Sequence, residues 1–201
     1  MSFVHWLVVL SALISLVGSF VYVRDTLKGT TRPNRVSWAL WALAPLVGTG
    51  AAISAHADIW ATTRTFLAGF IPLLVLIASF VNPRSYWKLT IFDFLCGAFS
   101  VLALLVWGLA SPRLAVLLAA AADGFAALPT LRKAWTNPET ETGLTFAAGL
   151  VAVLLVLPSI PKWTIENSAF QVYLLAINSL ILLAIYRRRF KFLTARRMGL
   201  D

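Results

Sequence analysis

Charged side chains are scarce in this chain. They make up 12% of the 201 residues, whereas hydrophobic residues make up 60%. So few polar groups cannot cover the surface of a water-soluble globule of this length, which excludes an ordinary soluble domain. We therefore expect an integral membrane protein.

Cysteine and histidine are also rare. The single cysteine, Cys96, excludes an intramolecular disulfide, and with two histidines no Cys/His cluster has the spacing of metal ligands. A Gly-rich phosphate loop, a nucleophile elbow and a paired-histidine helix are missing as well. We expect neither an enzyme nor a cofactor or metal, and an intramembrane hydrolase is the weakest alternative.

Long apolar runs are what the chain does contain. A bilayer core about 30 Å thick requires roughly 20 apolar residues per spanning helix. The first run has neither a charged n-region nor a small-residue cleavage site, so we expect it to be retained. The sequence predicts an all-α integral membrane fold with seven transmembrane helices, at about 3–23, 36–56, 60–81, 89–109, 113–134, 143–160 and 164–186.

Basic residues gather in alternate loops. If the C-terminus is cytoplasmic, fourteen of the 17 basic residues lie on the inner side, and Arg64, Arg113 and Lys162 lie on the other. This bias predicts an N-out, C-in protein of a cell inner membrane. We expect the basic cytoplasmic tail, 187–201, to lie against anionic lipid headgroups rather than to bind nucleic acid.

An internal repeat organises the chain. V21-Y-V-R-D-T-L-K-G-T-T-R-P-N-R-V-S-W38 returns in diluted form as A126-A-L-P-T-L-R-K-A-W-T-N-P-E-T-E-T-G143, at a constant offset of 105. We interpret 1–88 and 113–186 as two parallel three-helix repeats joined by a linker helix within 89–112. Parallel repeats of this kind occur in transporters.

The repeated segments also carry a family resemblance. R24-D-T-L-K-G-T-T-R-P-N-R-V-S-W-A-L-W41 and A127-L-P-T-L-R-K-A-W-T-N-P-E-T-E141 are similar to segments of small bacterial membrane proteins of the PQ-loop and SWEET superfamily. The resemblance implies a 3+1+3 helical fold, a central cavity between the repeats, alternating access, and substrates such as sugars or amino acids. Val23-Arg24 and Pro129-Thr130 stand where the motif has Pro-Gln, and Pro45 and Pro129 are the counterparts of the family's gating prolines.

Asp123 is the strongest candidate for a functional side chain. It lies about ten residues into its predicted span, within A119-A-A-A-D-G-F-A-A127. A carboxylate at that depth is costly and typically marks a solute, ion or proton site. The alternative is a carboxyl group that only holds helices together, with Arg64 or Asn178 as its partner.

Further polar and aromatic residues could line a cavity with Asp123. By the family resemblance, Asn178 matches a cavity asparagine of the seventh span, and Gln171 lies seven residues before it on nearly the same face. Trp38 and Trp41 are either members of an interfacial aromatic belt or a substrate platform. Ser11, Ser15, Gly18, Ser19 and Tyr22 form a small polar face that favours helix packing over a cavity wall. We expect an interfacial or packing role for Asp93.

Charges also cluster at the predicted inner mouth. Arg24 and Asp25 follow the first span, and Arg132, Lys133, Glu139 and Glu141 surround the second copy of the motif. They are either a network that closes an inner gate or plain topology signals.

Two functions remain open. The first is a secondary carrier that binds a small polar solute at mid-membrane between the repeats, with Asp123 as a proton-coupling carboxyl group. The second is a non-transporting receptor, a lipid-handling protein of the scramblase kind or an assembly factor on the same scaffold. Neither a monomer nor a homodimer is excluded.

Overall fold

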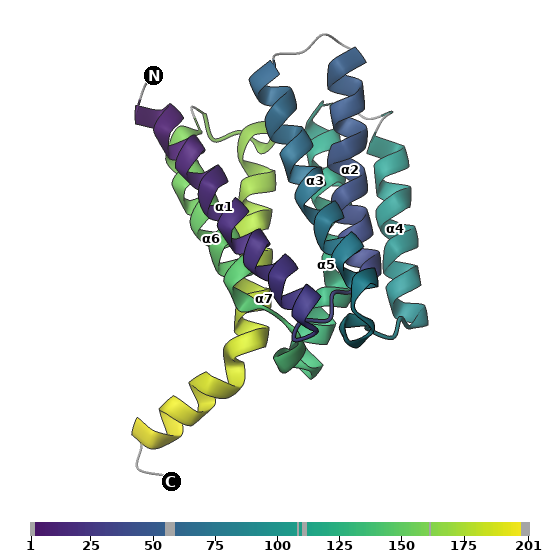
Figure 1. Ribbon diagram of the computed structural model, residues 1–201. Helices are drawn as coiled ribbons and strands as arrows, with labels where there is room; N and C mark the ends of the chain where they lie inside the picture. The colour runs from purple at the N-terminus through teal and green to yellow at the C-terminus, as the bar shows by residue number, and fades with distance from the viewer. Residues whose placement is uncertain (1–2, 55–58, 108, 110–111, 161, 198–201) are drawn as a thin grey trace.

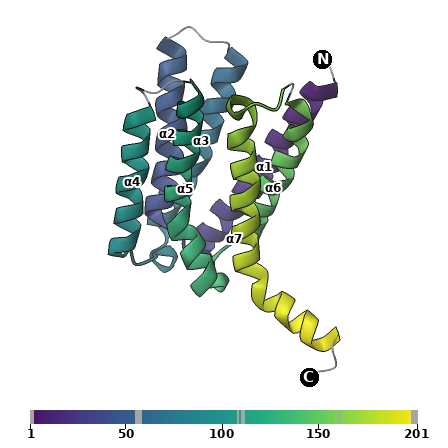
Figure 2. The same ribbon diagram turned by 180° about the vertical axis from the view of Figure 1, so that it is seen from behind.

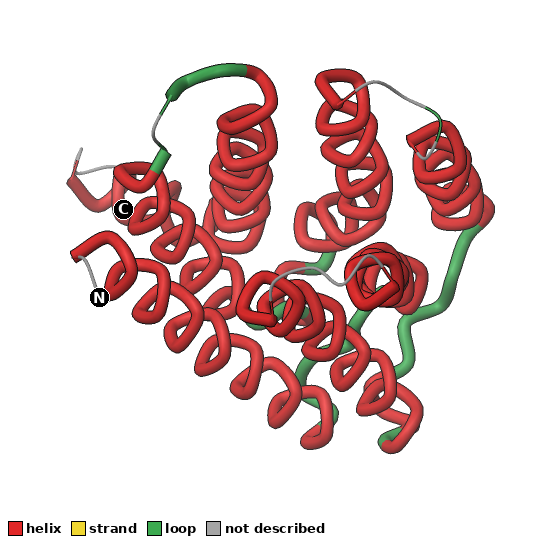
Figure 3. Tube along the Cα trace, turned by 90° about the horizontal axis from the view of Figure 1, so that it is seen from above, coloured by secondary structure: helices red, strands yellow, loops and turns green. Residues whose placement is uncertain are grey.

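The computed structural model describes residues 3–54, 59–107, 109, 112–160 and 162–197, and throughout these ranges the chain is all-α, without a strand (Figures 1 and 3). Short 3-10 turns occupy Pro83–Ser85, Pro138–Thr140 and Leu157–Ser159. A helix occupies each of the seven predicted segments, so the all-α prediction is confirmed. The α-helices are α1 (Phe3–Lys28), α2 (Arg35–Ser54), α3 (Ile59–Val81), α4 (Ile91–Trp107), α5 (Pro112–Thr136), α6 (Gly143–Val156) and α7 (Ile165–Arg197).

The last helix differs from its prediction in length. We expected it to end near residue 186, but α7 continues through the basic segment to Arg197. In two opposite views its final turns leave the bundle at an angle (Figures 1 and 2). A polybasic segment has no helix-breaking residue here, so nothing in the local sequence stops the helix at the end of the apolar run.

Two of the helical segments are long and apolar enough to cross a membrane by length and composition. They are Val9–Lys28 in α1 and Asn167–Arg187 in α7. Shorter apolar segments lie in α2, α3, α4 and α6. The two longer segments are consistent with a membrane location.

The side chains have an unusual distribution between inside and outside. Every one of the seven described helices carries exposed large apolar residues, among them Phe20 at 72%, Phe80 at 63% and Ile91 at 75% exposure. Small polar residues, by contrast, are buried between the helices: Thr26, Ser37, Ser79, Ser100 and Thr130. A protein folded in water normally shows the opposite preference.

Helix contacts follow a two-fold pattern. Helix α3 packs against both α1 and α2, and α7 packs against both α5 and α6. Between these groups, α1 packs on α6 and α2 packs on α5. Helix α4 packs on α5 and more weakly on α2, at the side of the bundle. An exchange of α1, α2 and α3 with α5, α6 and α7 therefore reproduces the contacts among these six helices, but not those of α4.

The turn after α1 is built on a glycine. Gly29 has a φ of +79°, a value that residues with a side chain rarely adopt. Its N–H bonds to the Thr26 carbonyl at 3.0 Å, and the Thr30 N–H bonds to the Asp25 carbonyl at 3.1 Å. These are the two hydrogen bonds of a Schellman cap, which ends α1 and turns the chain toward α2.

Three helices contain an internal proline: Pro45 in α2, Pro72 in α3 and Pro129 in α5. A proline cannot donate to the carbonyl four residues earlier, so it weakens the helix at that point. Pro45 and Pro129 were the two predicted gating prolines, and Pro72 is an addition. Pro45 and Pro72 lie at the level of the central cavity described below.

Candidate functional site

A cavity of about 380 Å³ lies at the centre of the bundle. Described residues of α1, α2, α3, α5, α6 and α7 line it, whereas none of those on α4 does. Most of its wall is apolar, and its polar groups come from both halves of the chain. The polar residues that line it are Ser15, Ser19, Trp38, Trp41, Asp123, Thr145 and Asn178.

Asp123 reaches the cavity from the middle of α5. The Tyr173 hydroxyl of α7 donates a hydrogen bond to Asp123 Oδ2 at 2.5 Å. The Trp41 indole lies beside the same carboxyl group, and its buried N–H has no hydrogen-bond partner among the described residues. The Tyr173 ring packs beside Gly124, where a Cβ would lie at an ordinary contact distance of 3.5 Å from it. The side chain of Arg64, the partner suggested by the sequence, lies outside the described part of the chain.

Asn178 lines the same cavity from α7. Its Nδ2 donates to the Leu174 carbonyl one turn earlier at 2.8 Å, which fixes the side chain against its own helix. Its Oδ1 faces Gly149 of α6 so closely that a Cβ at Gly149 would lie 2.8 Å away. Asn178 is thus held at the α6–α7 contact with its amide beside the cavity.

Gln171 is the predicted binding residue that the structure places elsewhere. The α7 residues lining the cavity include Phe170, Leu174 and Ile177, and Gln171 is not among them. Gln171 and Asn178 both flank this face of the helix. Asn178 therefore lines the central cavity without Gln171, and a binding role for Gln171 stays a prediction.

Two tryptophans form one wall of the cavity. Trp38 and Trp41 pack edge to face with ring centroids 5.1 Å apart. Trp38 is 4% exposed, and its ring lies 4.6 Å from that of Tyr22. Phe146 of α6 packs on the other side of Tyr22 at 6.3 Å. These rings form the floor of the cavity toward the end where the basic loops lie.

The small-residue face of α1 serves two purposes. Ser15 and Ser19 line the cavity. Gly18, in contrast, lies against α6, where the Thr145 hydroxyl donates to the Gly18 carbonyl at 2.5 Å. The predicted packing face is therefore correct for Gly18, and the two serines beside it form part of the cavity wall.

Below the aromatic floor, the two copies of the motif meet in what we call the loop junction, residues 29–34 and 137–142. The Arg32 N–H donates to the Thr140 carbonyl at 3.0 Å. The hydroxyls of Thr31 and Thr142 are in hydrogen-bond contact, and Thr142 also donates to Asp25 Oδ2 at 3.0 Å. Asp25 in turn pairs with Arg24 at 2.8 Å. Of the predicted gating residues, Asp25 therefore contacts this junction directly, and Arg24 contacts it through Asp25.

A buried ion pair joins the end of α5 to the loop junction. Lys133 Nζ is 2.6 Å from Glu141 Oε1, as an ion pair without the alignment of a hydrogen bond. The Tyr22 hydroxyl donates to Glu141 Oε2 at 2.8 Å, and Lys133 donates to the Arg32 carbonyl. The sequence placed these charges at the inner mouth, but it left open whether they form a network or serve as topology signals.

Asp93 has a capping role at the start of α4. Its Oδ2 accepts from the Thr90 N–H at 2.5 Å and from the Thr90 hydroxyl at 2.8 Å. Its Oδ1 accepts from Asn34 Nδ2 at 3.0 Å, while Asn34 Oδ1 accepts from the N–H groups of Val36 and Ser37. Asp93 thus links the starts of α4 and α2, in agreement with the packing role predicted for it.

Two smaller cavities adjoin these groups. One of about 100 Å³ lies between α2, α4, α5 and α7, and it shares Trp41, Pro45, Asp123 and Phe170 with the central cavity. Another of about 270 Å³ lies at the start of α4 and the end of α5, where the predicted gating residue Pro129 lines it together with Asp93 and Lys133.

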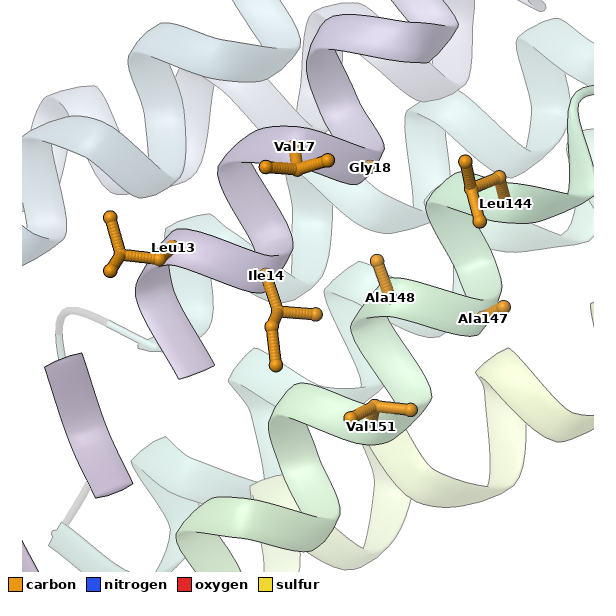
Figure 4. A pocket seen from close by; sticks show the side chains of 8 residues that line it. All are labelled: Leu13, Ile14, Val17, Gly18, Leu144, Ala147, Ala148 and Val151. Carbon is orange, nitrogen blue, oxygen red and sulfur yellow. The ribbon is translucent and has the colours of Figure 1, made fainter. Parts of the chain in front are cut away.

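An apolar groove of about 370 Å³ runs along the outside of the α1–α6 contact (Figure 4). Leu13, Ile14 and Val17 border it on α1, and Leu144, Ala147 and Val151 border it on α6. At its base Gly18 faces Ala148, and a Cβ at Gly18 would lie 2.4 Å from the Ala148 Cβ. The described part of the groove has no charged side chain.

Within the described residues, no group of three or more His, Cys, Asp or Glu side chains is placed to hold a metal ion. The comparisons with known proteins found no family model, no curated protein and no solved structure that matches this chain.

Proposed function

We propose that this chain is a seven-span carrier of an inner membrane, with its C-terminus in the cytoplasm, that moves a small polar solute by alternating access. The observation that carries the proposal is the central cavity. It receives side chains from α1, α2 and α3 and from α5, α6 and α7, and it contains a carboxyl group at mid-bundle. Pockets between helices that combine apolar walls with a few polar groups are the usual form of a small-molecule site.

The surface of the bundle supports a membrane environment. Large apolar side chains point outward on all of the described helices, and buried polar residues gather between them. Lipid tails are the solvent that favours this distribution. Among the described residues in the middle of α5, Asp123 is the charged one, and its side chain faces the cavity rather than the outside.

The helix contacts support two related three-helix units. Residues 1–88 contain α1 to α3, residues 113–186 contain α5, α6 and most of α7, and α4 is the linker. The pattern of contacts among these six helices, without α4, is unchanged when the two units are exchanged. Rocking of two such units around a fixed site is the motion by which repeat-built carriers expose a solute to either side.

The contacts at the loop junction support a cavity that is closed at this end of the bundle. The aromatic floor of Tyr22, Trp38 and Phe146 separates the cavity from the Lys133–Glu141 pair and from the hydrogen bonds between the two loops. On this proposal the junction is the inner gate, and it opens when the units rock.

Uptake by the purified protein in liposomes tests the proposal. Wild-type protein should accumulate a labelled solute chosen from a panel of sugars, amino acids and amines, first identified by thermal stabilisation in detergent. Asp123→Asn should abolish uptake and leave the protein folded. Unchanged transport by Asp123→Asn would remove Asp123 from the site.

The groove in Figure 4 favours a second function, handling of a lipid chain without solute transport. Its apolar walls and its position on the outside of the α1–α6 contact suit an acyl chain. Stabilisation by phospholipids alone, with no response to any water-soluble solute, would favour this second function over the carrier.

A further inference from the structure

Asp123 is the charged side chain among the described residues that line the central cavity. Its neighbours supply dipoles rather than a positive charge, namely the Tyr173 hydroxyl at 2.5 Å and the Trp41 indole N–H. None of the described lining residues is a lysine or an arginine. The cavity, as far as it is described, therefore has one acidic group and no basic one.

This imbalance has an electrostatic consequence. A carboxylate removed from water into a medium of low dielectric constant is strongly destabilised unless a positive charge lies next to it. The hydrogen bond from the Tyr173 hydroxyl reduces that cost but cannot remove it. A cationic ligand supplies the missing charge, whereas an anionic ligand adds a second negative charge to the same cavity.

The aromatic residues around Asp123 also favour a cationic ligand. Trp41 and Phe170 line both the central cavity and the smaller cavity that adjoins Asp123. The ring of Phe170 lies 5.8 Å from that of Tyr173, which holds the carboxyl group. Aromatic faces attract an ammonium group, and the attraction is strongest for tryptophan and away from water.

The rest of the wall is apolar. Leu67 and Ile71 of α3 face the cavity together with Leu174, Ile177 and Ile181 of α7. A polyol such as a sugar would leave most of its hydroxyl groups without partners against these residues, which costs binding energy. An aromatic or aliphatic body fits them without that cost.

From these observations we infer that the central cavity binds an organic cation, a protonated amine whose ammonium group pairs with Asp123 and whose apolar body lies against α3 and α7. This inference rests on the proposed function, because it assigns the ligand of the same cavity. It replaces the sugars and amino acids implied by the family resemblance with a narrower chemical class.

Three ligands with the same body and different head groups test the inference. They are 2-phenylethylamine, 2-phenylethanol and 3-phenylpropionate, which at neutral pH are a cation, a neutral molecule and an anion. Their affinities for the purified wild-type protein in detergent are measured by calorimetry and by thermal stabilisation. We expect the amine to bind on the order of tenfold more tightly than the alcohol, as a charge-assisted hydrogen bond predicts, and the anion not to bind.

Two variants assign the preference to Asp123. Asp123→Asn keeps the shape of the side chain and an oxygen for the Tyr173 hydroxyl, so it should reduce the affinity for the amine to that for the alcohol. Glu139→Gln removes one negative charge from an exposed residue that does not line the cavity, and it should leave the affinity for the amine unchanged. If Asp123→Asn fails to fold, the affinities of the wild-type protein for the amine, the alcohol and the anion still test whether the cavity prefers a cation.

Several outcomes would overturn the inference: equal binding of amine and alcohol, preferred binding of the anion, or the same amine affinity in Asp123→Asn. An ion pair between Asp123 and Arg64 would also abolish the preference for the amine and would be seen in the wild-type series. The carrier function is tested separately in liposomes. Amine binding without uptake would contradict the carrier function and leave the inference of a cationic ligand intact. Uptake of a neutral solute without amine binding would support the carrier function and overturn the inference.

Discussion

Lys133 and Glu141 form an ion pair of 2.6 Å in which the two side chains are 1% and 0% exposed. Tyr22 donates to the other oxygen of the Glu141 carboxylate, and Lys133 also donates to the Arg32 carbonyl. The pair therefore joins the end of α5 to α1 and to both loops of the junction. A buried pair of this kind is costly to break, because removal of one partner leaves an uncompensated charge in a medium of low dielectric constant.

Removal of either charge should strongly destabilise the protein. We expect Glu141→Gln or Lys133→Met to lower the free energy of unfolding by about 3–5 kcal/mol, the usual cost of one unpaired buried charge. Thermal and denaturant unfolding in detergent measures this change. The exposed Glu139 provides a matched control, and Glu139→Gln should leave the stability unchanged.

The double variant Lys133→Met with Glu141→Leu separates charge from packing. Because it leaves no isolated charge, it should recover most of the stability that either single variant loses. A double variant that is as unstable as the sum of the single variants would contradict this account and would assign the stabilisation to the pair itself.

Gly18 should be essential to the contact between α1 and α6. In Gly18→Ala the new methyl group would lie 2.4 Å from the Ala148 Cβ, and the backbone of Thr145 is 3.3 Å away. The helices would have to separate, at a cost of about 1–3 kcal/mol for an overpacked contact. Thermal unfolding of the purified variant measures the loss.

Gly50→Ala is the matched control for this prediction. It is the same substitution in α2, but a Cβ there meets no atom within 4 Å. Alanine favours a helix over glycine by about 0.5–1 kcal/mol, so this variant should be unchanged or slightly more stable. Equal effects of the two substitutions would mean that the α1–α6 contact adapts easily.

The sequence predicted those features of the fold that depend on local pattern. Hydropathy located all seven described helices, since an apolar run of helix-forming residues is a property of one segment. The position of Asp123 within such a run was enough to predict a special role, because a charge there is costly whatever surrounds it. Of the predicted binding residues, Trp38, Trp41 and Asn178 line the same cavity as Asp123.

Long-range partners could not be read from the sequence. Tyr173 bonds to Asp123 across 50 positions, and Tyr22 bonds to Glu141 across 119. Nothing in the neighbourhood of either tyrosine marks it as the partner of a carboxyl group. The close approach of Asn178 to Gly149 is of the same kind, because a helical face predicts direction but not the size of the residue opposite.

Pro45 should act as a hinge in α2 at the level of the cavity. It removes the hydrogen bond to the Trp41 carbonyl, and both residues line the cavity. Pro45→Ala restores that backbone bond, so we expect α2 to become stiffer, the protein to become more stable by about 1–3 kcal/mol, and uptake in liposomes to fall. Pro83→Ala, at the exposed first residue of the turn Pro83–Ser85, is the control and should leave uptake unchanged. If uptake persists in Pro45→Ala, the rocking motion does not bend α2 at this proline.

If the proposed carrier function is correct, the loop junction should be closed in one state and open in another, and a disulfide can test this. The hydroxyls of Thr31 and Thr142 are in hydrogen-bond contact, so the sulfur atoms in Thr31→Cys with Thr142→Cys would meet. Cys96→Ala removes the native thiol from the experiment. We expect oxidation to abolish uptake, a reductant to restore it, and the single-cysteine variants to remain active under oxidation. Ligand binding to the oxidised protein should persist, because the cavity lies on the other side of the aromatic floor. Full uptake by the cross-linked protein would show that the junction does not open, and it would transfer the inner gate to another part of the bundle.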